Sequence, residues 1–249
     1  MRLSQLLPIL PLLVSIPVQA QTDQEHPCYK YELIICRGSD EPSPLGVSLG
    51  PNTKATIEPI LGDDILAIGL IYPATFELPY SPETGIRNLV ARIQARAEQC
   101  PDMKFALTGF SQGADVVHHS LQELADVQDR IVGIATFGDP LTSIGFPPVY
   151  EGRAYNTCDK LDRSCGGEGI DGHSAYGDDP EAYEPAVDFL VERLEEEKSP
   201  EPTDSTETMA ELPSAGDAAA FLDLQVEWPP ADWAQKYPDG WVAEPVFVG

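Results

Sequence analysis

The sequence predicts an α/β sandwich in which helices cover both faces of a mainly parallel sheet. Short apolar runs rich in β-branched residues recur between residues 28 and 198, and segments with helical periodicity separate them. The apolar runs are continuous and do not alternate with polar residues, which is typical of strands covered on both faces. Regular alternation of such strands with helices indicates that the strands of the sheet run parallel to one another.

The apolar runs predict strands at 31–35, 66–72, 104–109 and 131–137. The helical patterns predict helices at 81–97, 112–127 and 180–197. Ser81 is expected to be the N-cap of the first of these helices, with Pro82 at its first helical position. Pro185 is expected to kink the last helix or to delay its start, because proline lacks the N–H that a helix interior needs.

The first 20 residues predict a secretory signal peptide rather than part of the fold. Arg2 precedes an apolar run that prolines interrupt, and Val18-Gln19-Ala20 offers small residues at the cleavage positions. Residues 21–27 then form an N-terminal tail. The run is too short and too rich in proline to span a membrane.

The chain changes character again after the predicted domain at 28–198. Residues 199–249 begin as an acidic Pro/Ser/Thr-rich linker and end in an arm that holds Trp228, Trp233 and Trp241. We expect this arm to pack on the domain or to remain loose. The alternative is an aromatic patch that binds a glycan or a partner.

The formal net charge of −26 restricts the possible partners. Such a surface repels phosphate backbones and anionic lipid headgroups, so we expect no nucleic-acid partner. No later apolar run reaches 18 residues, so we also expect a soluble protein without stable membrane insertion. We expect it to be a monomer.

A candidate nucleophile lies in the stretch LTGFSQGADVVHH, residues 107–119. Ser111 stands in a G-x-S-x-G pattern between a predicted strand and a predicted helix, which is where a nucleophile elbow occurs. Gly109 and Gly113 would let the two elements approach closely. The context therefore favours a catalytic serine.

Only one of the four histidines suits a base for Ser111. His26 belongs to the N-terminal tail. His118 and His119 follow seven and eight residues into the helix, about 10 Å along its axis, so we interpret them as ordinary helix residues. His173, in a glycine-rich loop, is the predicted base.

Four aspartates could orient that histidine. Asp159, Asp162 and Asp171 share its loop, and Asp139 ends a predicted strand. The chain order serine, aspartate, histidine matches that of α/β hydrolases. The residues by themselves leave the choice among the four open.

Several ordered motifs give the chain a family resemblance. ICRGSDE near the first strand, GFSQGADVV, the Cys158–Asp162–Cys165 spacing and the His173–Tyr176 pair resemble the cutinase family over about residues 28–194. That family includes cutinases, acetylxylan esterases and related esterases. The resemblance implies a small α/β-hydrolase fold with about five parallel strands, no large lid and neither cofactor nor metal.

The resemblance also implies roles for individual residues. It selects Asp162 as the triad acid, and it matches Ser39 and Gln112 to the two oxyanion-hole positions. It pairs Cys28 with Cys100 and Cys158 with Cys165. Cys36 lies inside a predicted buried strand, where a free cysteine behaves as a small hydrophobe, so we expect it to be unpaired and inert.

Together these features predict a secreted, extracellular serine carboxylesterase that works through an acyl-enzyme. The loop GGEGIDG, residues 166–172, is short and polar, so we expect short to medium acyl chains. The alternatives are an acetylxylan esterase and, from another class, a secreted carbohydrate- or calcium-binding protein without activity. The aspartate spacing does not fit an EF-hand loop.

Overall fold

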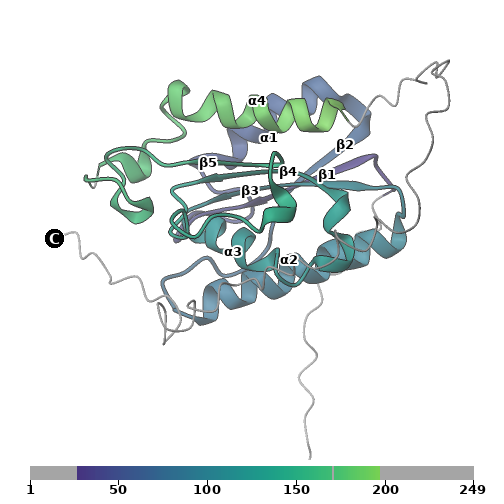
Figure 1. The fold of residues 1–249 in the computed structure, drawn as a ribbon, viewed down its shortest axis with the longest axis horizontal. Coiled ribbons are helices and arrows are strands. Elements are labelled where there is room, and N and C mark those ends of the chain that lie inside the picture. The colour runs from purple at the N-terminus through teal and green to yellow at the C-terminus, as the bar shows by residue number, and fades with distance from the viewer. Residues whose placement is uncertain (1–26, 170, 197–249) are drawn as a thin grey trace, which may run out of the picture.

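Five parallel strands form the central sheet of the computed structural model, which describes residues 27–169 and 171–196. The strands are β1 (Tyr31–Cys36), β2 (Ile65–Gly69), β3 (Lys104–Phe110), β4 (Ile131–Phe137) and β5 (Ala154–Thr157). Their order in the sheet is β2-β1-β3-β4-β5 (Figure 1). The predicted signal peptide, nearly all of the N-terminal tail, and the linker and arm beyond Glu196 lie outside the described residues.

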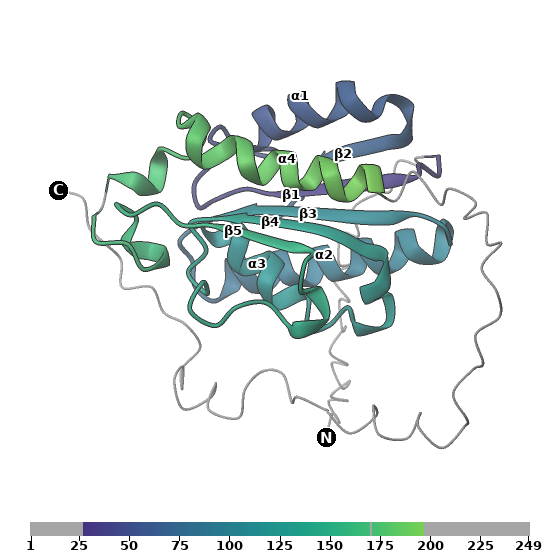
Figure 2. The same ribbon diagram turned by 45° about the horizontal axis from the view of Figure 1, so that its top comes forward.

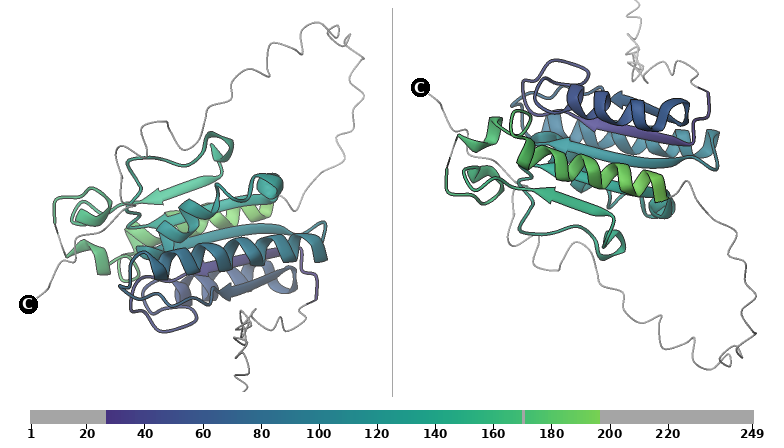
Figure 3. Two further views of the ribbon diagram at one scale, coloured as in Figure 1. Left: turned by 90° about the horizontal axis from the view of Figure 1, so that it is seen from below. Right: turned by 90° about the horizontal axis from the view of Figure 1, so that it is seen from above.

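Helices cover both faces of this sheet. On one face lie α1 (Gly50–Leu61) and α4 (Pro180–Glu196), and on the other lie α2 (Tyr80–Gln99) and α3 (Gln112–Ser120), as Figures 1 and 2 show. Alternate side chains of a strand enter opposite cores, so that Ile34 packs under α2 and α3 while Leu33 packs under α1 and α4. In Figure 3, α2 and α3 lie in front of the sheet in the view from below, and α1 and α4 lie in front of it in the view from above. The predicted α/β sandwich is confirmed.

The sequence patterns did not predict two elements, β5 and α1. β5 has four residues, AYNT, all of them half-buried, so it lacks the apolar run by which the other strands were found. α1 contains Pro59 and starts at Gly50-Pro51, and these residues disguise its helical pattern. Both elements are stabilised by packing on the sheet rather than by local propensity.

Two predicted elements are shorter than their patterns suggested. The helix expected over 112–127 ends at Ser120, whose Oγ donates to the Val116 carbonyl, and the chain then turns so that Leu121 and Leu124 enter the core. The strand expected over 66–72 ends at Gly69. Beyond it the carbonyls of Leu70 and Tyr72 accept hydrogen bonds from the Arg37 guanidinium instead of a neighbouring strand.

The predicted start of α2 is wrong. The helix begins at Tyr80 with Pro79 at the N-cap, so Ser81 and Pro82 lie inside its first turn. The Ser81 hydroxyl does not cap the helix because the Thr75 N–H and the Gln112 side chain bind it. Pro185 does not delay the last helix, since α4 starts at Pro180 and continues through Pro185.

Two disulfides fasten the described chain, Cys28–Cys100 and Cys158–Cys165. Cys36 is the free cysteine among the described residues, and its side chain is buried in β1. Burial raises the pKa of the Cys36 thiol, which suppresses the reactive thiolate. No helix of the described residues is long and apolar enough to cross a membrane.

The thiol arrangement can be measured on protein that has never been reduced. We expect no rapid reaction with a thiol reagent in the native state, because Cys36 is buried, and one thiol per chain after denaturation. The Cys36→Ser variant should then show none. A thiol that persists in Cys36→Ser would contradict the disulfide arrangement.

Candidate active site

Ser111 occupies a sharp turn between the end of β3 and the start of α3. Its backbone has φ 53° and ψ −117°, a conformation that side-chain-bearing residues rarely adopt. The Ser111 N–H donates to the Phe137 carbonyl at the end of β4, and the Ser111 carbonyl accepts from Ala114 and Asp115 in α3. These bonds hold the strained turn in place, as the nucleophile-elbow pattern predicts.

The flanking glycines allow the close contacts that this turn requires. A Cβ on Gly109 would lie 2.4 Å from the Gly113 carbonyl oxygen, and a Cβ on Gly113 would lie 2.0 Å from the carbonyl oxygen of Cys36. No side chain fits in either space. The helix therefore starts directly against β1 and β3, with Ser111 at the carboxyl edge of the sheet.

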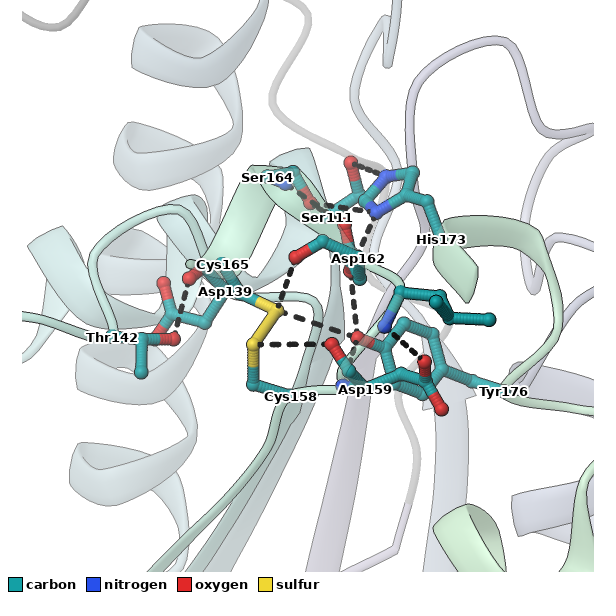
Figure 4. A network of polar contacts seen from close by, with 11 residues as sticks. Ser111, Asp139, Thr142, Cys158, Asp159, Asp162, Ser164, Cys165, His173 and Tyr176 are labelled. Carbon is teal, nitrogen blue, oxygen red and sulfur yellow. Dashed lines mark hydrogen bonds and ion pairs between the residues drawn. A yellow bond between two sulfur atoms is a disulfide. The ribbon is translucent and has the colours of Figure 1, made fainter. Parts of the chain in front are cut away.

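His173 contacts both Ser111 and Asp162 (Figure 4). Its Nε2 lies 2.8 Å from Ser111 Oγ, and its Nδ1 lies 2.9 Å from Asp162 Oδ2. The imidazole packs beside the Phe110 ring, with ring centroids 5.0 Å apart. Gly138, with φ 55°, packs directly against Asp162 and His173. A Cβ at this position would lie 2.8 Å from Asp162 Oδ2 and 3.1 Å from the His173 ring.

The Asp162 carboxylate is buried and fully engaged by donors. Besides the imidazole, Tyr176 Oη donates to Oδ2 at 2.6 Å, and the backbone N–H and hydroxyl of Ser164 donate to Oδ1 at 2.9 and 2.5 Å. Burial by itself would raise the pKa of Asp162, but the hydrogen bonds from His173, Ser164 and Tyr176 lower it to about 2. The carboxylate is therefore ionised at neutral and mildly acid pH.

Ser164 and Tyr176 had no role assigned from the sequence. Ser164 Oγ also lies 2.7 Å from His173 Nδ1, so it contacts both members of the aspartate–histidine pair. Tyr176 additionally accepts the Asp159 N–H, and its pKa is raised by burial and by Asp162. The motif His173–Tyr176 marked the tyrosine, whereas nothing in the sequence distinguished Ser164.

The disulfide Cys158–Cys165 closes the loop that carries Asp162. Within this loop the Asp162 N–H donates to the Asp159 carbonyl, and the Gly167 N–H donates to the Asp162 carbonyl. The position of the carboxylate is thus fixed by a covalent link and by backbone hydrogen bonds.

The other candidate acids have different surroundings. Asp139 is buried, but its Oδ2 lies 3.0 Å from Nδ1 of His118 and its Oδ1 accepts the Leu141 N–H. Asp159 accepts the Leu161 N–H, and Asp171 is exposed. The structure brings only Asp162, of these four, to His173.

The histidines of α3 do not reach Ser111, as expected, but they are not ordinary helix residues. His118 is fully buried, its Nε2 lies 2.9 Å from the Gly145 carbonyl, and its ring stacks on Phe146. His119 Nδ1 lies 2.8 Å from Asp115 Oδ1. No sequence pattern indicates the His118–Asp139 pair, because the two residues come from different elements.

Ser39 and Gln112 lie together beside the elbow. The Gln112 side chain donates from Nε2 to Ser39 Oγ at 3.1 Å, and Gln112 directly follows Ser111 at the N-terminus of α3. Within the described chain neither the Ser39 N–H nor the Gln112 N–H has a hydrogen-bond acceptor. Two backbone donors and one hydroxyl are therefore available next to the serine, and the helix N-terminus favours negative charge there.

The loop that carries Ser39 is fixed by its charged neighbours. The buried Arg37 guanidinium donates to the carbonyls of Glu41, Leu70, Tyr72 and Pro73. The Glu41 carboxylate accepts N–H groups from both sides of the loop, Gly38 at 2.6 Å and Ser48 at 2.7 Å. The motif ICRGSDE therefore supplies a rigid turn around Ser39.

The fold and the Ser111–His173–Asp162 contacts define an α/β hydrolase. The chain belongs to the cutinase family, whose sequence profile matches residues 27–194. It is accordingly a carboxylic ester hydrolase. Among the residues described, no group of three or more His, Cys, Asp or Glu side chains is arranged to hold a metal ion.

Individual relatives agree with this assignment. Cutinase 1 of Fusarium vanettenii is 33% identical over 180 residues, which cover 67% of this chain and 77% of the relative. The structure of a Trichoderma reesei cutinase with a phosphonate inhibitor is 28% identical, has a TM-score of 0.58, and covers 68% of this chain and 78% of its own. The catalytic core of a T. reesei acetylxylan esterase, 17% identical, shares the fold with a TM-score of 0.54 over 67% of this chain and all of its own.

Two matched substitutions test which buried aspartate serves the histidine. We expect Asp162→Asn to lower kcat by about 10⁴-fold with the fold retained, by analogy with the serine-protease triad. Asp139→Asn removes the same charge at an equally buried site, but it should lower Tm and keep most of kcat, because its partner is His118. Steady-state kinetics and thermal unfolding of both variants separate the two effects. A collapse of kcat in Asp139→Asn alone would contradict the assignment.

Proposed function

We propose that this protein is a secreted serine carboxylesterase that hydrolyses esters of short to medium acyl chains through an acyl-enzyme. The observation that carries the proposal is the continuous set of contacts from Ser111 Oγ through His173 to the ionised Asp162. A nucleophile, a base within hydrogen-bonding distance and a group that orients the base are the requirements of this chemistry.

In the first half of the reaction Ser111 Oγ attacks the ester carbonyl. His173 Nε2 takes the hydroxyl proton, and Asp162 stabilises the resulting imidazolium through Nδ1. The tetrahedral oxyanion accepts hydrogen bonds from the N–H groups of Ser39 and Gln112 and from the Ser39 hydroxyl. His173 then gives its proton to the leaving alcohol, and the acyl group stays on Ser111.

In the second half a water molecule repeats the attack on the acyl-enzyme. His173 accepts the water proton, the oxyanion forms again at the same donors, and the Ser111 oxygen leaves with the proton that His173 returns. Each half uses the same base and the same donors, so no additional group is required.

Secretion is supported by two features. The N-terminal pattern up to Ala20 fits a signal peptide, and the described domain contains two disulfides, which persist in oxidising compartments. We therefore place the mature enzyme outside the cell.

The proposed chain-length preference rests on the residues near the triad. Glu168 and Asp171, in the loop before His173, are exposed and charged, so the described part of this loop offers little apolar surface to an acyl chain. Exposed aromatic side chains, which no sequence pattern indicated, provide apolar surface elsewhere. Phe76 and Tyr80 are 70% and 56% exposed in the segment that follows Thr75, whose carbonyl binds the Gln112 side chain. We propose that a short to medium chain gains contact there, and that longer chains gain little more.

Covalent labelling tests the nucleophile. A fluorophosphonate probe should modify one residue of the wild-type protein, Ser111, and Ser111→Ala should neither be labelled nor hydrolyse esters. Peptide mass spectrometry locates the adduct. Labelling that persists in Ser111→Ala would refute the proposed nucleophile.

A p-nitrophenyl ester series tests the acyl preference. We expect kcat/KM to be highest between about C2 and C6, since each methylene gains roughly 0.8 kcal/mol only where an apolar wall buries it. Phe76→Ser should selectively weaken the longer members of the range, with Val149→Ser, at a residue that is 40% exposed in a different segment, as control. A steady rise beyond C8 would overturn the preference. Strong release of acetate from acetylated xylan would instead favour an acetylxylan esterase.

A further inference from the structure

Ser81 lies in the first turn of α2 and takes part in a buried polar contact with the proposed oxyanion site. Its side chain is fully buried. Ser81 Oγ accepts the Thr75 N–H at 2.9 Å and donates its proton to Gln112 Oε1 at 2.8 Å. The serine therefore links the backbone before α2 to the side chain that touches Ser39.

The direction of each hydrogen bond in this group is determined by chemistry. A backbone N–H can only donate, so Ser81 Oγ must accept from Thr75, and its own proton is left for Gln112 Oε1. The Thr75 carbonyl can only accept, so Gln112 Nε2 must face it, and together the two contacts orient the amide with its oxygen toward Ser81. Both Nε2 hydrogens are then used, one on the Thr75 carbonyl at 2.8 Å and one on Ser39 Oγ at 3.1 Å.

The consequence for Ser39 concerns its hydroxyl proton. Because Ser39 Oγ accepts a hydrogen bond from Gln112, its O–H is free to donate elsewhere. With the amide turned over, Gln112 would present its oxygen to Ser39 and would take that proton. The orientation of one amide thus decides whether the Ser39 hydroxyl is available as a donor.

We propose that Ser81 is a positioning residue that keeps the Ser39 hydroxyl directed at the oxyanion by fixing the Gln112 amide. This inference rests on the proposed function, since it assumes that Ser39 binds the oxyanion. It assigns Ser81 no contact with substrate.

A purely structural role as a helix cap does not explain the contacts of Ser81. A serine at the N-cap accepts N–H groups from the first turn of its own helix. Ser81 instead lies one residue inside α2, accepts the Thr75 N–H from the preceding loop, and donates to Gln112 in α3. Its hydroxyl connects three segments of the site.

The experiment is a double-mutant cycle between Ser81 and Ser39. Removal of one oxyanion donor costs about 10²–10³ in kcat, so Ser39→Ala should show a loss of that order. Ser81→Ala should lower kcat by about tenfold, less than the direct donor, because the Thr75 carbonyl still holds the amide. KM should change little, since the oxyanion exists only in the transition state. In the Ser39→Ala background, Ser81→Ala should have almost no further effect on kcat.

Two further variants make the cycle decisive. Ser120→Ala also deletes one fully buried serine hydroxyl, which donates to the Val116 carbonyl in α3, and it should leave kcat unchanged. Gln112→Met keeps the backbone N–H but removes the amide. It should lower kcat at least as much as Ser81→Ala, and in the Gln112→Met background Ser81→Ala should have almost no further effect on kcat. If Ser81→Ala does not fold, Ser81→Cys takes its place in both cycles, because it fills the same position with only a weak hydrogen-bond donor.

A trifluoromethyl ketone, which forms a tetrahedral adduct on an active-site serine, provides a readout that simple destabilisation does not change. Its Ki should rise in Ser81→Ala by the factor by which kcat/KM falls. Equal losses from Ser81→Ala with and without the Ser39 hydroxyl would overturn the inference, as would wild-type kcat in Ser81→Ala. Failure of the proposed function is distinguishable, because the wild-type protein would then lack esterase activity and Ser111 labelling.

Discussion

The site depends on the close approach of α3 to the first and third strands. Gly113 packs against the Cys36 carbonyl so closely that no side chain could be added, and Ser111, two residues earlier, adopts its strained backbone conformation in the turn that leads into this contact. The same contact places the N-terminus of α3 beside the loop that follows β1. Ser111, the N-terminus of α3 and Ser39 are thus close together at one edge of the sheet.

Around this elbow the loops are held by buried polar groups more than by apolar packing. Arg37 donates to the Glu41 carbonyl in the Ser39 turn and to the Tyr72 carbonyl in the segment after β2, and Asp162 accepts hydrogen bonds from Ser164, His173 and Tyr176. Such groups are stable only when fully hydrogen-bonded, because an unpaired buried charge is costly. The arrangement is therefore rigid, and rigid donors stabilise a developing charge without having to reorganise.

The residues to which we assign roles in the reaction fall into two groups that are far apart in the chain. Asp162 lies in the disulfide-closed loop after β5, and His173 follows it. Ser39, in contrast, follows β1, and Ser81 lies in α2, after β2. They meet only because parallel strands end at one edge of the sheet, where loops from different strands converge. A substitution in one group can therefore leave the contacts of the other group unchanged.

The sequence determined the parallel α/β fold, because continuous apolar strands and amphipathic helices are local patterns with fixed periods. It also indicated Ser111 through its G-x-S-x-G motif and His173 through the exclusion of the other histidines. Both inferences need only the positions of residues along the chain. β5 and α1 were missed because tertiary packing, not local propensity, stabilises them. Only the tertiary structure showed that Asp139 contacts His118 whereas Asp162 contacts His173. It likewise showed that the Ser81 hydroxyl donates to Gln112 and does not cap its own helix. Hydrogen-bond partners distant in the chain leave no periodic trace, so their pairing is decided when the elements pack.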